Sequence, residues 1–177
     1  MRDLMVVNDL QQGLIDEITE VLKDIKTVKA SGEDAGEDAI GFTGYKQNLP
    51  VIVNDDETPD QFFPYFIVRI IDGEREAEMG LRYVSVAVII GVHDDCPQND
   101  GHETVMTAIT RIINRFDWEP TLHGERMAFR NDDMGTKWAL QDEDTYPYFF
   151  GAVELKFYTP IIGRREPFNG YSKNPKI

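Results

Sequence analysis

The run Leu81–His93, "LRYVSVAVIIGVH", is the most regular part of this chain, and it decides which fold the rest can join. Over nine positions, β-branched apolar residues alternate with a second set, Ser85, Ala87, Ile89 and Gly91, which is mostly small. A period of two places alternate side chains on opposite faces of a strand. The run therefore predicts a long strand with one buried face, made by Val84, Val86, Val88, Ile90 and Val92.

Other strands are expected on both sides of this run. "PYFIVRII", Pro64–Ile71, is rich in β-forming residues, and the link to the next run is short and polar, so the two should pair as an antiparallel hairpin. The segment Tyr148–Thr159 alternates in the same way. Weaker strands are expected in "TLHGERMAFR", Thr121–Arg130, and as a short edge strand in "LPVIV", Leu49–Val53.

Two amphipathic helices are predicted from apolar residues at spacings of three and four. The first carries Leu10, Leu14, Ile18, Val21, Leu22 and Ile25, with Asn8 or Asp9 as its expected N-cap. The second begins near Gly101 and ends before Asp117. Its stripe consists of Val105, Ile109, Ile112, Ile113 and Phe116.

The remaining segments are expected to be loops. Residues Thr27–Gln61 are small, acidic and Gly-rich, and Asn131–Pro147 is polar with Trp138 at its centre. The order of elements predicts an α+β fold, with two helices packed on one face of a mainly antiparallel, roughly four-stranded sheet with long loops. Residues 1–160 are expected to form one domain and 161–177 an extended tail. The expected core is Leu14, Ile18, Leu22, Val84, Val86, Val88, Ile90, Ile109, Ile113, Val153, Leu155 and Phe157.

The charge of the chain narrows the classes of partner. Lys and Arg number 18 and Asp and Glu 32, which gives a net charge of −14. Such a field repels phosphate backbones and anionic lipid, although it also serves solubility alone. A single cysteine, Cys96, suits a reducing compartment, and no signal-peptide core or membrane-length apolar run is present. The chain is therefore expected to be made in the cytosol and to bind no membrane.

The sequence offers little support for catalysis or for a metal site. "HDDCPQNDGH", His93–His102, lacks the ligand spacings of zinc sites, and the acidic runs lack the calcium-loop pattern. The paired acids fall in predicted loops, where no burial would raise their pKa values for acid–base work. We therefore expect no enzyme activity, no cofactor and no metal.

Aromatic residues among acids point instead to contacts between proteins. "WALQDEDTYPYFFGAVELKF", Trp138–Phe157, runs from an acidic loop directly into a strand. Exposed aromatic side chains are favoured at protein interfaces. The tail is basic, with four cations against one acid, and is complementary to an acidic neighbour. The candidate interface residues are Trp138, Asp142, Glu143, Asp144, Tyr146, Arg164 and Arg165.

Three stretches together resemble the tail terminator proteins of long-tailed, non-contractile bacteriophages, also called tail completion or tail-to-head joining proteins. They are "FFPYFIVRIIDGE", "VAVIIGVHDDCPQNDGHETVMTAITRIINRF" and "WALQDEDTYPYFFGAVELKFYTP", which lie between Phe62 and Pro160. The resemblance implies an α+β subunit that assembles as a hexameric ring, without enzymatic activity or cofactor.

In such a ring, the resemblance also implies the partners. The ring caps the tail tube and joins it to a head-completion or connector protein, while DNA passes through without specific binding. The protein would be assembled in the host cytoplasm and reside in the virion. Two alternatives remain open: another phage neck or tail component, such as a head-completion or tube protein, and a small-ligand-binding or enzymatic α+β domain.

Overall fold

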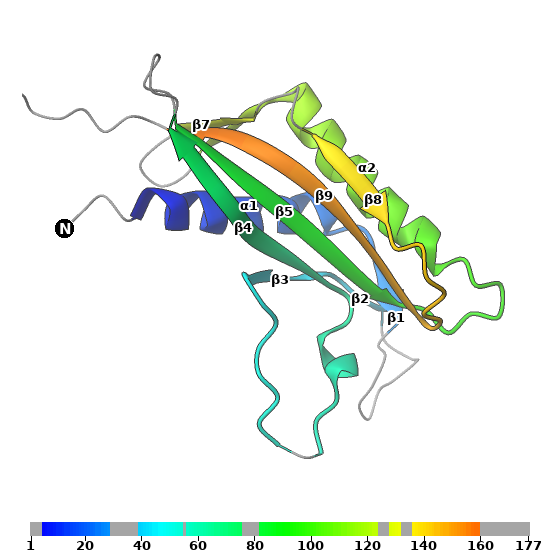
Figure 1. Cartoon of the computed structure of the whole chain (residues 1–177). Coiled ribbons are helices and arrows are strands. Elements are labelled where there is room, and N and C mark those ends of the chain that lie inside the picture. The colour runs from blue at the N-terminus through cyan, green and yellow to red at the C-terminus, as the bar shows by residue number, and fades with distance from the viewer. Residues whose placement is uncertain are drawn as a thin grey trace, which may run out of the picture.

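The computed structural model describes residues 5–28, 39–54, 56–75, 82–123, 128–131 and 136–159. Two α-helices, a short 3₁₀ helix and nine strands make up this part of the chain (Figure 1). In chain order they are α1 (Met5–Leu22), β1 (Thr27–Val28), β2 (Ala39–Ile40), β3 (Thr43–Lys46), η1 (Pro59–Phe62), β4 (Tyr65–Arg75), β5 (Arg82–His93), α2 (Gly101–Trp118), β6 (Thr121–His123), β7 (Ala128–Asn131), β8 (Lys137–Leu140) and β9 (Tyr148–Thr159).

The main sheet is built around β5, the strand predicted from its alternating pattern. β5 pairs antiparallel with β4 on one side and with β9 on the other, and the β4–β5 hairpin is confirmed. Further out, β3 pairs parallel with β4, whereas β7 and β8 both pair antiparallel with successive parts of β9. A β-bulge between Ile70 and Asp72 interrupts the register of β4 against β5.

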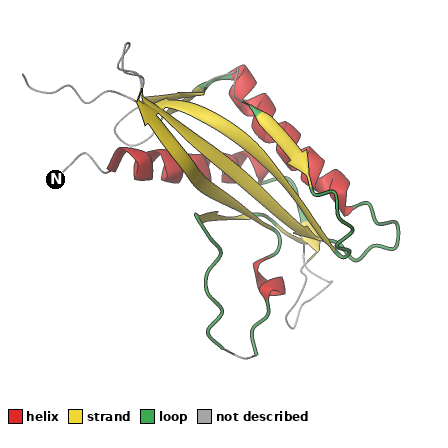
Figure 2. Ribbon diagram, viewed as in Figure 1, coloured by secondary structure: helices red, strands yellow, loops and turns green. Residues whose placement is uncertain are grey.

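Both helices pack on one face of this sheet, as the layers in Figure 2 show. The core lies between the two helices and the sheet. It includes Val88 of β5, Ile109 of α2 and Leu14 of α1, each at most 1 % exposed. Helix α1 contacts β3 and β6, which stand at opposite ends of the strand order. The sheet therefore curls around the helix, with its other face turned outward.

The predicted sheet was wrong in size and in kind. The structure has seven strands in this sheet, it is mixed because β3 runs parallel to β4, and it curls strongly instead of lying as a roughly four-stranded antiparallel layer. The missed strands are short, and their sequences do not alternate. β8 shows the reason: Lys137, Trp138 and Ala139 are all exposed, so its residues carry no buried face to signal a strand.

Several smaller expectations also need correction. Helix α1 already includes Met5, so Asn8 and Asp9 lie inside it and neither is the N-cap. Leu49–Val53 is not a strand, and the segment expected to be one long loop contains β1, β2, β3 and η1. All predicted core residues are buried except Ile113, which is partly buried against the core.

Two glutamines fix the point where β3 ends. Gln47 adopts a positive φ of 59° and turns its side-chain amide back onto β4. Its Oε1 accepts a hydrogen bond from the Ile70 amide at 2.6 Å and another from Gln11 Nε2 at 3.0 Å. Gln11, which is 5 % exposed, also donates to the Val68 carbonyl at 2.7 Å. These side-chain hydrogen bonds continue the pairing between β3 and β4 one residue beyond the end of β3. The chain then leaves the sheet.

Candidate protein-interaction surfaces

The loop between β8 and β9, residues 141–147, is fastened at both ends. Gln141 donates its amide hydrogen to the Phe150 carbonyl at 3.0 Å, and Tyr148 donates to the Thr145 carbonyl at 2.9 Å. The loop also reaches the β5–α2 connection, because the Tyr146 hydroxyl donates to the Asp95 carbonyl at 2.7 Å. These bonds give an exposed acidic segment a defined shape.

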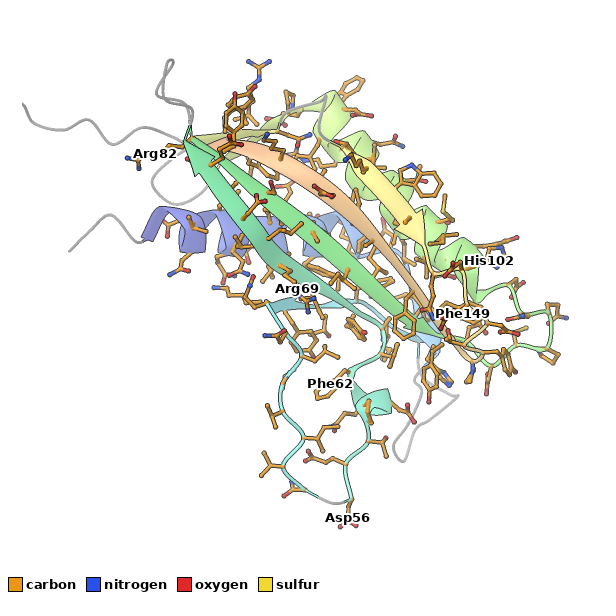
Figure 3. All side chains as sticks on the ribbon, viewed as in Figure 1. Asp56, Phe62, Arg69, Arg82, His102 and Phe149 are labelled. Atoms are coloured by element: carbon orange, nitrogen blue, oxygen red, sulfur yellow. The ribbon has the colours of Figure 1, made fainter. Side chains whose placement is uncertain are left out.

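Beside this loop, the surface is hollowed. An open hollow of about 440 Å³ lies between the loop, the start of α2 and the first residues of β9. Figure 3 shows His102 of α2 and Phe149 of β9 at this end of the molecule. The residues that line the hollow include Asn99, His102, Asp142, Glu143, Phe149 and Phe150.

The chemistry of the hollow follows from its lining. Asp142, Glu143 and Asp144 are exposed on the loop, and the described lining includes no Lys or Arg. An anionic group placed there would meet three carboxylates and no lysine or arginine, so phosphate-containing ligands are disfavoured. The aromatic rings of Phe149 and Phe150 make the inner side apolar, which suits contact with a protein side chain.

A second surface is the arm, which we define as residues 47–62, between β3 and β4. Figure 1 shows this segment hanging clear of the sheet before it returns through η1. Its root packs against the outward sheet face in a cluster of Phe63, Tyr65 and Ile67, with Tyr45, Leu49, Phe62, Ile89, Tyr148 and Phe150 at its margin. The Tyr148 hydroxyl donates to Asp60 Oδ1 at 2.6 Å and so ties the arm to β9.

The tip of the arm, by contrast, carries two apolar side chains that are largely exposed. Val51 and Val53 are 85 % and 84 % exposed, and Asp56 stands at the far end in Figure 3. Each exposed valine forgoes about 1.5–3 kcal/mol that burial against apolar surface would supply. Two such residues on one projecting segment are a candidate contact with another protein.

The residues proposed from the sequence fall into two groups. Trp138 lies on β8 and is 53 % exposed, while Tyr146 is 45 % exposed. Together with Asp142, Glu143 and Asp144, they lie on the one hairpin of β8 and β9, and the three acids line the hollow. Arg164 and Arg165, like the rest of the predicted tail 161–177, lie outside the described residues. Their contact with a neighbour stays a prediction.

Sequence reasoning missed the exposed apolar residues of the arm and of the end of α2. The sequence predicts an edge strand for Val51 and Val53, although an acidic turn follows directly. Trp118, at the last position of α2, is 91 % exposed. The sequence does hint at this exposure, because Trp118 follows the last residue of the apolar stripe and lies off the buried face of the helix.

Three tyrosines near the arm should make the fold sensitive to alkali. Burial raises the pKa of Tyr45 and of Tyr65, and the hydrogen bond to Asp60, followed by burial, raises the pKa of Tyr148. Because the pKa values are raised in the folded state, the stability they contribute is complete below the unfolded-state pKa of about 10. It is lost as the pH rises above that value.

We therefore expect the urea midpoint to fall above about pH 10, where the unfolded chain begins to lose phenol protons. Tyr65→Phe removes one of these protons without removing the ring, so its midpoint should fall less steeply over the same range. Urea titrations between neutral pH and pH 11 would measure both slopes. Equal slopes in the two proteins would show that Tyr65 does not contribute.

Neither α1 nor α2 is both long enough and apolar enough to cross a membrane. Within the ranges that the structure describes, no three His, Cys, Asp or Glu side chains are grouped as metal ligands. Comparison with protein-family models and with curated protein sequences finds no match to this chain.

Proposed function

We propose that this chain is a structural assembly subunit of a bacteriophage, a tail terminator that forms a ring on the tail tube and joins it to the head. The observation that carries the proposal is the exposure of Val51 and Val53 on the arm next to β3, and of Trp138 on β8, which lies on the other side of the central strand β5. A subunit with contact residues on both sides of its central strand suits a head-to-tail arrangement, which closes into a ring when the rotation permits. The sequence resemblance to tail terminators supports the particular identity.

The acidic loop has a place in this proposal. Asp142, Glu143 and Asp144 are exposed beside aromatic residues, which suits contact with another virion protein at the end of the ring. The proposed partners are further copies of the chain, the tail-tube protein, and a head-completion or connector protein. DNA would pass through the ring without specific binding, since a surface of like charge does not retain a polyanion.

Deleting the gene from the phage or prophage genome that carries it would test the function. The proposal expects lysates with filled heads that lack joined tails, and with free tail tubes of irregular length. A plasmid copy should restore joined particles. Negative-stain electron microscopy of the lysates and plaque counts would measure the loss and the rescue.

Other outcomes would point elsewhere. Tails of normal length that fail to join heads would favour a head-completion protein, and an absence of tubes would favour a tube protein. Normal, infectious particles after deletion would contradict every structural assignment. In that case, a ligand for the hollow beside α2 would be the next question.

A further inference from the structure

The first observation concerns the outgoing limb of the arm. Its residues Leu49–Val53 form no strand, and none of their backbone groups bonds elsewhere in the described part of the chain. The limb is rich in β-branched residues, which suit a strand once a partner is supplied. Val51 and Val53 are two positions apart, so in an extended limb they would share one face.

The arm keeps its shape without that partner. At its root, Arg69 Nε donates to the Gln47 carbonyl at 3.0 Å and its guanidinium donates to Asn48 Oδ1 at 3.3 Å. The ring of Phe62 packs edge-on against Tyr45, with centroids 6.0 Å apart. At the tip, Asn54 Nδ2 donates to Glu57 Oε1 at 2.8 Å and closes a turn. An arm already ordered loses little entropy when it binds.

The second observation is an open strand edge on the other side of the central strand β5. Among the described strands, β8 pairs with β9 alone, and Lys137, Trp138 and Ala139 are exposed. An unpaired edge presents amide and carbonyl groups to any strand that can add to it. The β3 side, from which the arm springs, lies four strand spacings away, about 19 Å across the sheet.

The two features match in length, polarity and charge. β8 has four residues, and the limb Leu49–Val53, with five, is long enough to lie along all of them. Trp138 lies opposite Val153, on the helix-bearing face of the sheet, and offers an apolar surface for the two valines. Lys137 is exposed on β8, whereas Asp56 and Glu57 are exposed at the tip of the arm. These opposite charges favour the approach of the arm of one copy to β8 of the next.

We propose that the limb Leu49–Val53 of one copy adds as an edge strand to β8 of the next copy, with Val51 and Val53 against Trp138. The contact is heterologous: each copy uses its arm on one side and its β8 edge on the other. The inference rests on the proposed function, since it names the contact that would link subunits within the ring.

Two double variants separate the two halves of the contact. Val51→Asp with Val53→Asp places charge on the arm, and Lys137→Glu with Ala139→Glu makes the β8 edge acidic. All four side chains are exposed, so melting temperatures should stay close to that of the parent chain. Each variant alone should be monomeric by size-exclusion chromatography with light scattering, at concentrations where the parent assembles.

Mixing the two variants is the decisive step. The arm variant retains an intact edge and the edge variant an intact arm, so an equimolar mixture should form a one-to-one dimer and nothing larger. Ile71→Asp, which charges another half-exposed apolar residue outside both elements, is the matched control and should assemble normally.

The outcomes distinguish this contact from the function itself. Normal assembly of either double variant would overturn the proposed contact, and so would a folded mixture that gives no dimer. Neither result would contradict the proposed function, because another contact could join the subunits. A parent chain that stays monomeric at every concentration would overturn the contact. If deletion of the gene also leaves phage tails normal, both the contact and the proposed function fail.

Discussion

Phe157→Ala should cost about 3–5 kcal/mol of unfolding free energy, the range for truncating a fully buried aromatic residue. Phe157 is 0 % exposed and lies near the end of β9. Its ring meets Phe116 of α2 edge-on, with centroids 5.4 Å apart, so truncation opens a cavity between the sheet and the helix. Urea unfolding followed by circular dichroism would measure the loss.

Trp118→Ala is the matched control for this truncation. It removes a larger aromatic side chain from α2, but Trp118 is 91 % exposed, so the change should stay within about 0.5 kcal/mol. Similar losses in the two variants would mean that the helix and sheet do not pack as described. A loss at Trp118 alone would place that residue in the core instead.

Gly151→Ala has the second largest expected effect, because it wedges α2 away from β9. A Cβ at this position would lie 2.7 Å from Val105 Cγ1, 3.0 Å from Ile109 Cδ1 and 3.2 Å from the Ala139 carbonyl oxygen. We expect overpacking to cost about 1–3 kcal/mol. This exceeds the 0.4–1 kcal/mol or so that a Gly→Ala change gains through the unfolded chain.

Val105→Ala should rescue this variant in part. It removes the methyl groups nearest the new Cβ, so the double variant should be more stable than the sum of the single changes predicts, by about 0.5–3 kcal/mol. Denaturant unfolding of the four proteins completes the cycle. Strict additivity would show that Gly151 and Val105 are not in contact.

The long elements were predictable because each has one fully buried face. Val84, Val86 and Val88 alternate with less apolar residues, and the stripes of both helices recur at helical spacing. Such periodicity shows which side chains are buried, and its period distinguishes a strand from a helix. For this reason β5 and β9, both helices and nearly all of the core followed from the sequence.

The rest depended on contacts between distant segments. β3 is a strand because β4 lies beside it and Gln47 extends the pairing, neither of which the sequence around Thr43 records. β8 exists because β9 offers an edge, and its exposed residues carry no strand signal. Of the two candidate surfaces, the sequence indicated only the β8–β9 hairpin, through its acidic and aromatic residues. The arm became a candidate only once the structure showed that Val51 and Val53 are exposed.

If the proposed function is right, the chain is part of the phage particle, at the junction of tail and head. Immunogold electron microscopy of purified phage, with an antibody raised against the full chain, tests it most directly. Because the joined head would mask much of the ring, tails released from their heads should be labelled in parallel. We expect gold at the head-proximal end of the tail. Particles and tails that contain none of the chain, by labelling and by mass spectrometry, would contradict the account.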